Sequence, residues 1–239
     1  CSNRTLDCVL TAGRRGTEGL IVYPVSMSIS GRLCVVVGGG KVSERKVSGL
    51  LAAGGRVRVI SPVLTGSLRA LADRGRVAWR ENPHGPGDLD DPFLLFAATD
   101  QPAVQTAVQR DARAAGLLAN IADAPEACDF QIPAAVRRGD LLLTVSTSGR
   151  SPAVSAMIRR QLECEFGEEY GLLTDLLGEA RDRILAGPAS PAERKARLQE
   201  MFHADILDWL RSGRWDRIEH HLNHVLGDDA LLRPADSGR

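Results

Sequence analysis

The chain has 239 residues, of which 44% are hydrophobic and 25% are charged, so it has enough apolar material for one substantial core and a smaller second body. Lys and Arg together number 30, as do Asp and Glu, and the formal net charge is zero. A nucleic-acid surface normally needs a basic excess, so we expect no nucleic-acid partner. Any anionic ligand must then be bound by a local cluster of cationic side chains.

The five cysteines are scattered, and none forms a Cys-x-x-Cys pair. This argues against a disulfide framework or a zinc knuckle and favours a reducing, cytoplasmic setting. The longest apolar runs, 33–37 and 141–145, are of strand length and too short to cross a bilayer, so we expect no membrane association.

Residues 1–22 contain three glycines among charges and no signal-peptide pattern, and we expect a disordered or variable extension there. Cys1 has two interpretations, a processed lipoprotein terminus or a start without functional meaning, and we favour the second.

Regular patterning begins at Tyr23. Residues 33–37 are an apolar, β-branched run typical of a buried parallel strand. Helical spacing follows over 42–53 and ends at Gly54-Gly55, as a left-handed helix cap requires, and 57–60 form the next strand. The spacing predicts a β-α-β unit of about thirty residues.

The alternation continues along the chain. We expect a helix over 65–74, a strand over 77–80, a loop over 83–92, a strand over 93–98, a helix over 102–115 and a strand over 117–121. Strands that alternate with helices predict an α/β fold, a Rossmann-type doubly wound parallel sheet with helices on both faces.

The pattern changes after Pro125. Two strands are expected over 130–135 and 141–146, joined by a polar turn at 137–140 into an antiparallel addition. Helical patterns then cover 153–166, 169–185, 191–210 and 214–226, followed by a polar tail after Gly227.

A glycine-rich loop connects the first predicted strand and helix. In Gly38-x-Gly40-x-x-Ser43, the first glycine permits a tight turn and the second lets a pyrophosphate approach the backbone at a helix N-terminus. Ser43 stands where a third glycine is usual, and its small side chain still allows close packing. A simple chain-reversing turn is the alternative, but the flanking strands and helix favour dinucleotide binding.

The second strand ends in Ile60-Ser61-Pro62, without the Asp or Glu that usually contacts the adenosine ribose. Backbone or hydroxyl groups must therefore bind the ribose. The sequence does not decide between NAD and NADP on physical grounds.

Asp123 comes just past the carboxyl end of the predicted strand 117–121, at the edge where open α/β sheets bind ligands. It has two interpretations of equal weight on sequence alone. A positioned carboxylate there can act as a base, and an Asp before Pro125 can also simply cap a turn.

Four blocks resemble the precorrin-2 dehydrogenase and sirohaem synthase N-terminal family. They are Tyr23-Pro-Val with Val37-Gly-Gly-Gly-Lys-Val-Ser-Glu-Arg-Lys46, then Phe96-Ala-Ala-Thr-Asp100, then Asn120-Ile-Ala-Asp-Ala-Pro125, and Val145-Ser-Thr-Ser-Gly-Arg-Ser-Pro152. Their order and spacing agree with the family over residues 23–226.

The resemblance implies an NAD-dependent enzyme that oxidises precorrin-2 to sirohydrochlorin in sirohaem biosynthesis, with iron or cobalt insertion as an additional activity in some relatives. It implies a homodimer with an NAD-binding domain over 23–133, a strand-containing dimerisation region over 134–166 and a C-terminal helical domain over 167–239. The methyltransferase domain of some members is not expected within these residues.

The resemblance also assigns site residues. Asp123 is expected to be catalytic. The residues expected to bind NAD are Gly38, Gly39, Gly40, Lys41, Val42, Ser61, Pro62, Val63, Thr99, Asp100 and Asn120. Those expected to bind the tetrapyrrole are Ser146, Thr147, Ser148, Arg150 and Ser151.

Precorrin-2 carries many carboxylates, and Arg150 is the best candidate to bind one of them, because a guanidinium grips a carboxylate with two hydrogen bonds. We interpret Arg137 and Arg138 as solvating an exposed turn. His220 and His224 share a helix face, but no Glu or Cys completes a ligand set, so we predict no metal site.

Cys128 follows Asp123 closely without a His nearby in sequence and is interpreted as a packed or bystander thiol. Trp209 and Trp215 fit the apolar faces of the last helices. The competing function is a regulatory module that binds NAD without catalysis. Such a module has no need of the block around Asp123 or of a helical substrate domain.

Overall fold

The computed structural model describes residues 22–85, 87–89 and 92–227, so the expected N-terminal extension, apart from residue 22, and the polar tail lie outside the described residues. The chain divides into two compact units, one up to Ile132 and one from Pro133 onward. Each is described by itself. No helix in the described ranges has both the length and the apolar composition needed to span a membrane.

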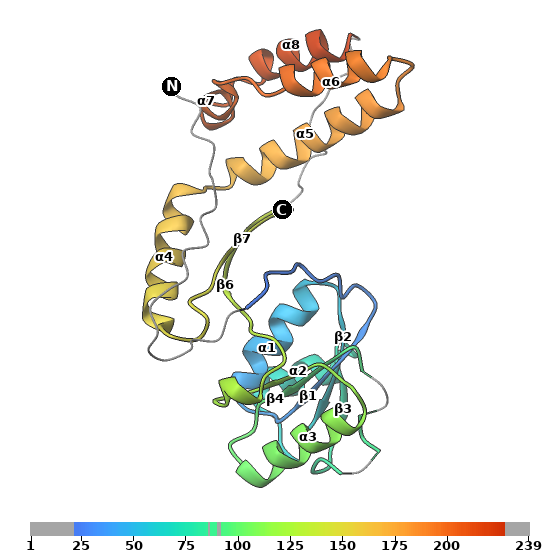
Figure 1. The fold of residues 1–239 in the computed structure, drawn as a ribbon, viewed down its shortest axis with the longest axis vertical. Helices are drawn as coiled ribbons and strands as arrows, with labels where there is room; N and C mark the ends of the chain where they lie inside the picture. The colour runs from blue at the N-terminus through green and yellow to red at the C-terminus, as the bar shows by residue number, and fades with distance from the viewer. Residues whose placement is uncertain (1–21, 86, 90–91, 228–239) are drawn as a thin grey trace. The chain divides into compact units, whose positions relative to one another are not determined.

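The first unit contains a parallel sheet (Figure 1) of five strands in the order β3-β2-β1-β4-β5, the Rossmann arrangement that the sequence predicts. The strands are β1 (Leu33–Val37), β2 (Arg56–Ile60), β3 (Ala78–Arg80), β4 (Leu94–Ala97) and β5 (Ala119–Ile121). The helices are α1 (Lys41–Ala52), α2 (Gly66–Asp73) and α3 (Pro102–Ala114), with a short 3-10 turn, η1 (Pro125–Ala127).

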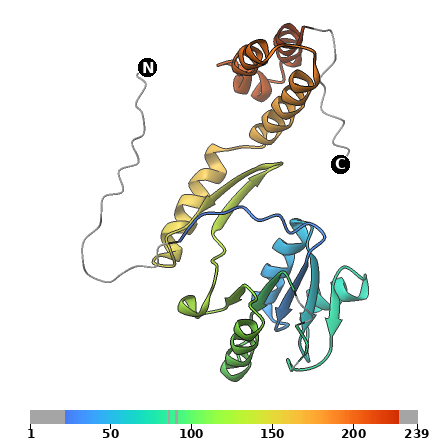
Figure 2. The same ribbon diagram turned by 45° about the vertical axis from the view of Figure 1, so that its right-hand side comes forward.

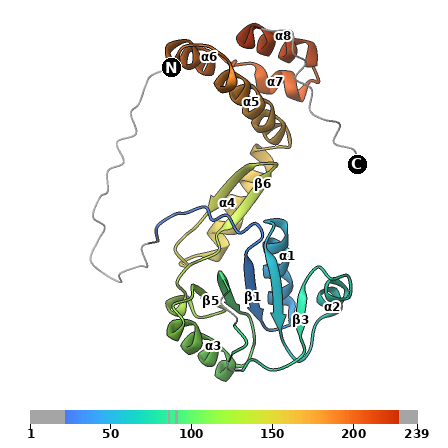
Figure 3. The ribbon, with the colours of Figure 1, turned by 90° about the vertical axis from the view of Figure 1, so that its right-hand side faces the viewer.

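Alternate side chains of the strands feed two cores, because successive residues of a strand point to opposite faces. Cys34 and Val36 of β1 pack on one face together with Val47 of α1 and Leu68 of α2. The opposite face packs against α3. Helices therefore cover both faces of the sheet (Figure 3).

The second unit begins with an antiparallel ribbon of β6 (Ala134–Arg138) and β7 (Leu141–Val145). The ribbon lies along α4 (Pro152–Glu165), as Figure 2 shows. Four further helices form a separate hydrophobic core: α5 (Glu169–Ala186), α6 (Pro191–Glu200), α7 (Ile206–Arg211) and α8 (Trp215–Leu226). Trp209 and Trp215 pack against that core, as expected.

Two expected elements are wrong. The strand expected over 130–135 begins only at Ala134, because the ring of Phe130 packs edge-on against Phe96 of the parallel sheet, with 5.5 Å between centroids. The helix expected over 191–210 is two helices, α6 and α7. At their junction His203 stacks on Trp209, and its Nδ1 accepts a hydrogen bond from the Asp205 amide.

Arg138 is also not the solvating side chain that the sequence suggested. It belongs to β6, and its guanidinium donates to the carbonyls of Phe166 at 2.8 Å and Glu163 at 3.1 Å. It therefore ties the ribbon to the end of α4.

Candidate functional site

The glycine loop lies at the carboxyl edge of the sheet, where β1 and β4 run side by side and their helices leave in opposite directions. The amide of Gly38 donates to the Ile60 carbonyl at 2.9 Å, and Ala98 donates to Val37 at 2.8 Å. Ligands of open α/β sheets bind at this switch in strand order.

The first two glycines are required by close backbone contacts. Gly38 has φ +114°, and a Cβ on it would lie 2.2 Å from the Ala98 carbonyl oxygen. A Cβ on Gly39 would lie 1.9 Å from the Val63 carbonyl oxygen. Neither position accommodates a side chain without movement of backbone.

Gly40 differs, because nothing lies within 4 Å of the position its Cβ would take. It is the N-cap of α1, so free amides of the first helical turn face this open space. A cradle lined by backbone, open at Gly40 and set at a helix N-terminus fits the pyrophosphate of a dinucleotide.

Ser43 replaces the third glycine of the usual pattern. It is fully buried, and its hydroxyl donates to the Ala98 carbonyl at 3.2 Å. The hydroxyl therefore adds a hydrogen bond where glycine would only allow close packing.

Two other expected cofactor residues follow directly on α1. The side chain of Lys41 is exposed and pairs with Glu44 at 2.9 Å, and Val42 is exposed. The Thr65 hydroxyl and the Lys41 ammonium hold the pKa of Glu44 below its ordinary value, so it stays a carboxylate.

The segment after β2 forms one wall of the cradle. Ser61 is buried, its hydroxyl donates to the Val63 carbonyl at 2.8 Å, and its own carbonyl accepts from the Trp79 indole at 2.9 Å. Pro62 and Val63 are exposed. This turn offers backbone and hydroxyl groups, in keeping with the missing acid at the end of β2.

The segment after β4 contributes Thr99 and Asp100. The Thr99 carbonyl accepts from the Gln105 side chain at 2.7 Å, and its hydroxyl accepts from the Gln101 amide at 3.3 Å. Asp100 is exposed at the same edge.

Asp123 lies in the loop after β5, at the same carboxyl edge, where Ala122 donates to the Ala97 carbonyl at 2.8 Å. The side chain is exposed, and its backbone has φ +60°, the left-handed region that non-glycine residues rarely adopt. Strain of this kind clusters at functional sites, which favours a role beyond capping a turn.

Asn120 is different from the other expected cofactor residues. It is buried, its Oδ1 accepts from Lys46 at 2.6 Å, and its Nδ2 donates to the Phe130 carbonyl at 2.9 Å. Sequence reasoning singled out Asn120 but missed Lys46. The signal was available, because Lys46 follows the buried Ser43 by three residues and therefore lies near it on the helix.

The expected substrate residues lie in the second unit, in the turn between β7 and α4. The Thr147 hydroxyl accepts from the Ser151 amide at 3.1 Å and lies 3.2 Å from the hydroxyl of Ser155, a residue the sequence did not single out. Ser148 has φ +52° and its amide donates to Ser146 at 3.1 Å.

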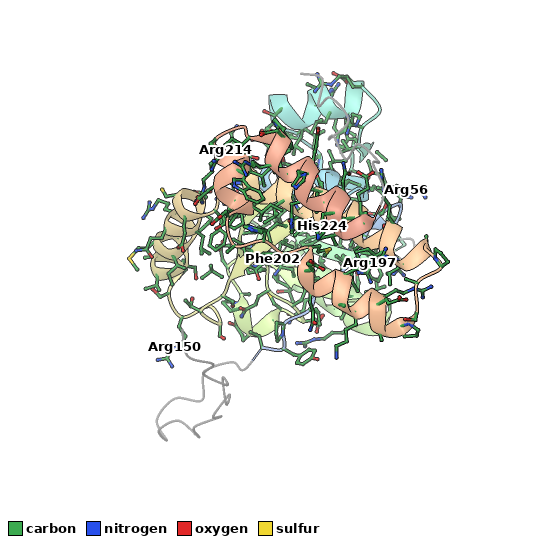
Figure 4. All side chains as sticks on the ribbon, turned by 90° about the horizontal axis from the view of Figure 1, so that it is seen from above. Arg56, Arg150, Arg197, Phe202, Arg214 and His224 are labelled. Atoms are coloured by element: carbon green, nitrogen blue, oxygen red, sulfur yellow. The ribbon has the colours of Figure 1, made fainter. Side chains whose placement is uncertain are left out.

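Ser151 is the N-cap of α4, where its hydroxyl accepts from Val154 at 3.3 Å. Arg150 precedes this cap and extends outward from the loop (Figure 4). An exposed guanidinium beside a helix N-terminus is suited to a carboxylate.

Two of the three histidines of α8 have other partners. His221 lies 3.2 Å from the Met201 carbonyl, and His224 is exposed, 3.9 Å from Glu200. In the described part of the chain, no three His, Cys, Asp or Glu side chains are grouped as metal ligands.

The comparisons with known proteins agree with this architecture, first at the level of class. Residues 25–134 match a family described as NAD(P)-binding, and residues 138–164 match the central domain of sirohaem biosynthesis proteins. The first unit is therefore a nicotinamide-dinucleotide-binding domain.

Individual relatives are more specific. The chain is 34% identical over 203 residues to a sirohaem synthase of Methylobacillus flagellatus and 35% identical over 211 residues to one of Xylella fastidiosa. These alignments cover 85% and 88% of this chain but 44% of each relative, so the chain spans less than half the length of these relatives.

A solved structure of SirC, a precorrin-2 dehydrogenase, superimposes with a TM-score of 0.71 at 27% identity and covers 85% of this chain and 98% of that one. The chain is thus similar, over most of its length, to sirohaem synthases and to a precorrin-2 dehydrogenase.

Proposed function

We propose that this chain oxidises precorrin-2 to sirohydrochlorin with NAD as the oxidant. The observation that carries the proposal is the left-handed Asp123, exposed at the same sheet edge as the glycine cradle. The kinship with SirC, named as a precorrin-2 dehydrogenase, identifies the substrate class.

The cradle residues hold the dinucleotide. Gly38, Gly39 and Gly40 bring backbone against its pyrophosphate, and the amides of Lys41 and Val42 begin the helix that faces it. Ser61 to Val63 border the adenosine ribose, and Thr99 and Asp100 line the opposite side. When bound, NAD supplies the hydride acceptor.

Asp123 removes the proton that leaves the substrate together with the hydride, so the overall reaction converts precorrin-2 and NAD⁺ into sirohydrochlorin, NADH and a proton. An exposed carboxylate suits this role, because it can take a proton from the substrate and pass it to water.

The second unit supplies the substrate contacts. Arg150 binds a substrate carboxylate, and the hydroxyl-rich turn 146–151 donates further hydrogen bonds. We also propose that residues 134–166 pair two copies of the chain, with residues 167–239 as the helical substrate domain, and that the homodimer works in the cytoplasm.

The test is anaerobic incubation of the full chain with precorrin-2 and either NAD or NADP, followed by the reduced-cofactor and sirohydrochlorin spectra. We expect both signals with NAD, a loss of about 10²- to 10⁴-fold in kcat for Asp123→Ala, and unchanged NAD binding. Glu126→Ala, an exposed carboxylate three residues away, is the control.

Binding of NAD without formation of sirohydrochlorin would overturn the proposal and favour a regulatory module that senses NAD. Faster turnover with NADP would overturn the cofactor assignment alone. Adding ferrous or cobaltous ion after oxidation tests metal insertion into the product.

A further inference from the structure

A chain of side-chain contacts connects the helix of the glycine cradle with the loop that carries Asp123. It runs from Lys46 on α1 to Asn120 on β5 and then to Cys128. None of these three side chains has a role in the reaction as proposed above other than the cofactor contact expected of Asn120. All lie in the first unit.

The Cys128 thiol contacts the backbone both before and after Asp123. Its sulfur accepts from the Ile121 amide at 3.2 Å and lies 3.2 Å from the Ile121 carbonyl and 3.3 Å from the Ala124 carbonyl. Burial raises the pKa of this thiol, so it keeps the proton that it donates to one of those carbonyls. The contacts close a short loop with Asp123 at its exposed side.

Asn120 fixes the returning segment of that loop. Its Nδ2 donates to the Phe130 carbonyl at 2.9 Å and lies 3.6 Å from the Cys128 sulfur. The Asn120 side chain can make these contacts only in one orientation, because its Oδ1 must face the Lys46 ammonium.

Lys46 sets that orientation. Its Nζ lies 2.6 Å from Asn120 Oδ1 and 5.2 Å from the centre of the Phe96 ring, a cation–π distance. Burial lowers the pKa of Lys46, while the nearby Cys128 and Asp123 raise it. A half-buried ammonium held by one amide oxygen is a specific arrangement that an apolar residue would not reproduce.

Asp123 needs such support. A left-handed, non-glycine residue is strained and persists only when its surroundings hold it. Within the described residues the Asp123 carboxylate makes no hydrogen bond or ion pair of its own, so its loop must be held through the backbone.

We propose that Lys46, Asn120 and Cys128 are positioning residues that hold the Asp123 loop in its left-handed conformation. This rests on the proposed function, which makes Asp123 the base. The three residues act through the loop and do not touch substrate. They also link the geometry of Asp123 to α1, the helix whose N-terminus faces the dinucleotide.

The experiment compares Cys128→Ala, Cys128→Ser and Lys46→Met in the full chain. Cys34→Ala is the matched control for a buried thiol, because Cys34 is fully buried in β1 of the same unit, and Lys195→Met on α6 is the control for a lysine. The measurements are kcat and KM for precorrin-2, the NAD dissociation constant, Tm, and hydrogen exchange of the peptide 119–130.

We expect Cys128→Ala and Lys46→Met to lower kcat by about 10- to 100-fold, with KM and NAD binding within about twofold of wild type. Exchange of peptide 119–130 becomes faster in both. Cys128→Ser, which keeps a donor and an acceptor, recovers part of kcat. Cys34→Ala lowers Tm but not kcat.

A second comparison separates this proposal from the proposed function. In an Asp123→Ala background, Cys128→Ala should lower kcat no further, because it acts only through Asp123. A wild-type chain that does not oxidise precorrin-2 overturns the proposed function, and the exchange measurement then decides whether the three residues hold the loop. Loss of kcat without faster exchange, faster exchange without loss of kcat, or an equal loss in Cys34→Ala overturns the positioning role.

Discussion

Among the described residues, each unit contains one non-glycine residue with a left-handed backbone, Asp123 in the first and Ser148 in the second. Both lie in loops that the sequence links to the site, but different interactions hold them. Asp123 is supported by side chains from α1, β5 and the following loop, one of them 74 residues away from its partner. Ser148 is supported by hydroxyls of its own segment, between 146 and 155.

The Asp123 loop and the Ser148 loop are therefore stabilised in two different ways. The first couples the loop to a packed core, so its geometry depends on distant residues. The second is built from local hydrogen bonds at a helix N-terminus and depends on its own sequence. Mutations in the core should therefore disturb the Asp123 loop more than the Ser148 loop.

The largest expected effect is on stability, and it differs between a glycine of the first unit, Gly39, and one of the second, Gly171. Gly39→Ala places a Cβ 1.9 Å from a backbone oxygen, whereas Gly171→Ala on α5 places one 3.0 Å from the Arg138 carbonyl carbon. We expect Gly39→Ala to cost about 3 kcal/mol or more in unfolding free energy and Gly171→Ala about 1 kcal/mol. Gly40→Ala is the control for the cradle. Urea unfolding is the measurement, and an equal cost for the two would contradict the contrast.

Gly40→Ala also has an outcome of its own. Nothing within 4 Å opposes its Cβ, so the fold should keep its stability while the NAD dissociation constant rises at least about tenfold. Unchanged NAD affinity would mean that the pyrophosphate lies elsewhere.

Removing the backbone strain gives a smaller effect. Glycine adopts φ near +60° without steric cost, so Asp123→Gly and Ser148→Gly should each be more stable than the corresponding alanine variant, by about 1 kcal/mol. Only Asp123→Gly should lower kcat, by about the 10²- to 10⁴-fold expected for Asp123→Ala. Thermal unfolding beside kcat checks this, and Ser148→Gly with wild-type KM would show that the turn does not depend on its left-handed serine.

A last effect, of similar size, concerns the exposed start of helix α6 in the second unit. Ser190 and Glu193 form a capping box on α6, and their hydrogen bonds hold the pKa of Glu193 below its ordinary value near 4.5. A lowered carboxyl pKa means stability that is present above pH 4.5 and lost as the pH falls through the folded-state pKa. Ser190→Ala should cost about 1 kcal/mol at neutral pH.

That cost should shrink in acid, because a protonated Glu193 accepts only weakly from the Ser190 hydroxyl, the bond that Ser190→Ala removes. Circular dichroism of thermal unfolding at pH 7 and pH 3 measures it. If Ser190→Ala lowers stability equally at pH 7 and pH 3, Ser190 does not act through its hydrogen bonds with Glu193.

The parallel sheet could be predicted from sequence because its central strands β1 and β4 are buried on both faces and read as continuous apolar runs. The same reasoning failed where tertiary contacts decide. Phe130 has strand propensity, yet its ring packs on Phe96 and the strand starts at Ala134. The 191–210 helix is interrupted because His203 stacks on Trp209, a contact that periodicity does not contain.

The candidate site, like the fold, could be predicted where local rules decide and not where tertiary contacts do. Glycine spacing and strand ends locate the cradle and Asp123, because both follow local rules. The left-handed backbone of Asp123, the thiol beside it and the bond from Lys46 to Asn120 depend on partners up to 74 residues apart. The prediction that Arg138 solvates an exposed turn was wrong for the same reason, since its carbonyl partners lie 25 and 28 residues further along the chain.

The turn after β2 limits how this domain could be redesigned or could evolve. A change of dinucleotide preference is commonly sought where that strand ends, by adding or removing an acid. Here Ser61 is buried and bonded to Val63, whose carbonyl lies against Gly39. A carboxylate at this position would displace the loop and the cradle together, so altered coenzyme preference would require coordinated changes in both.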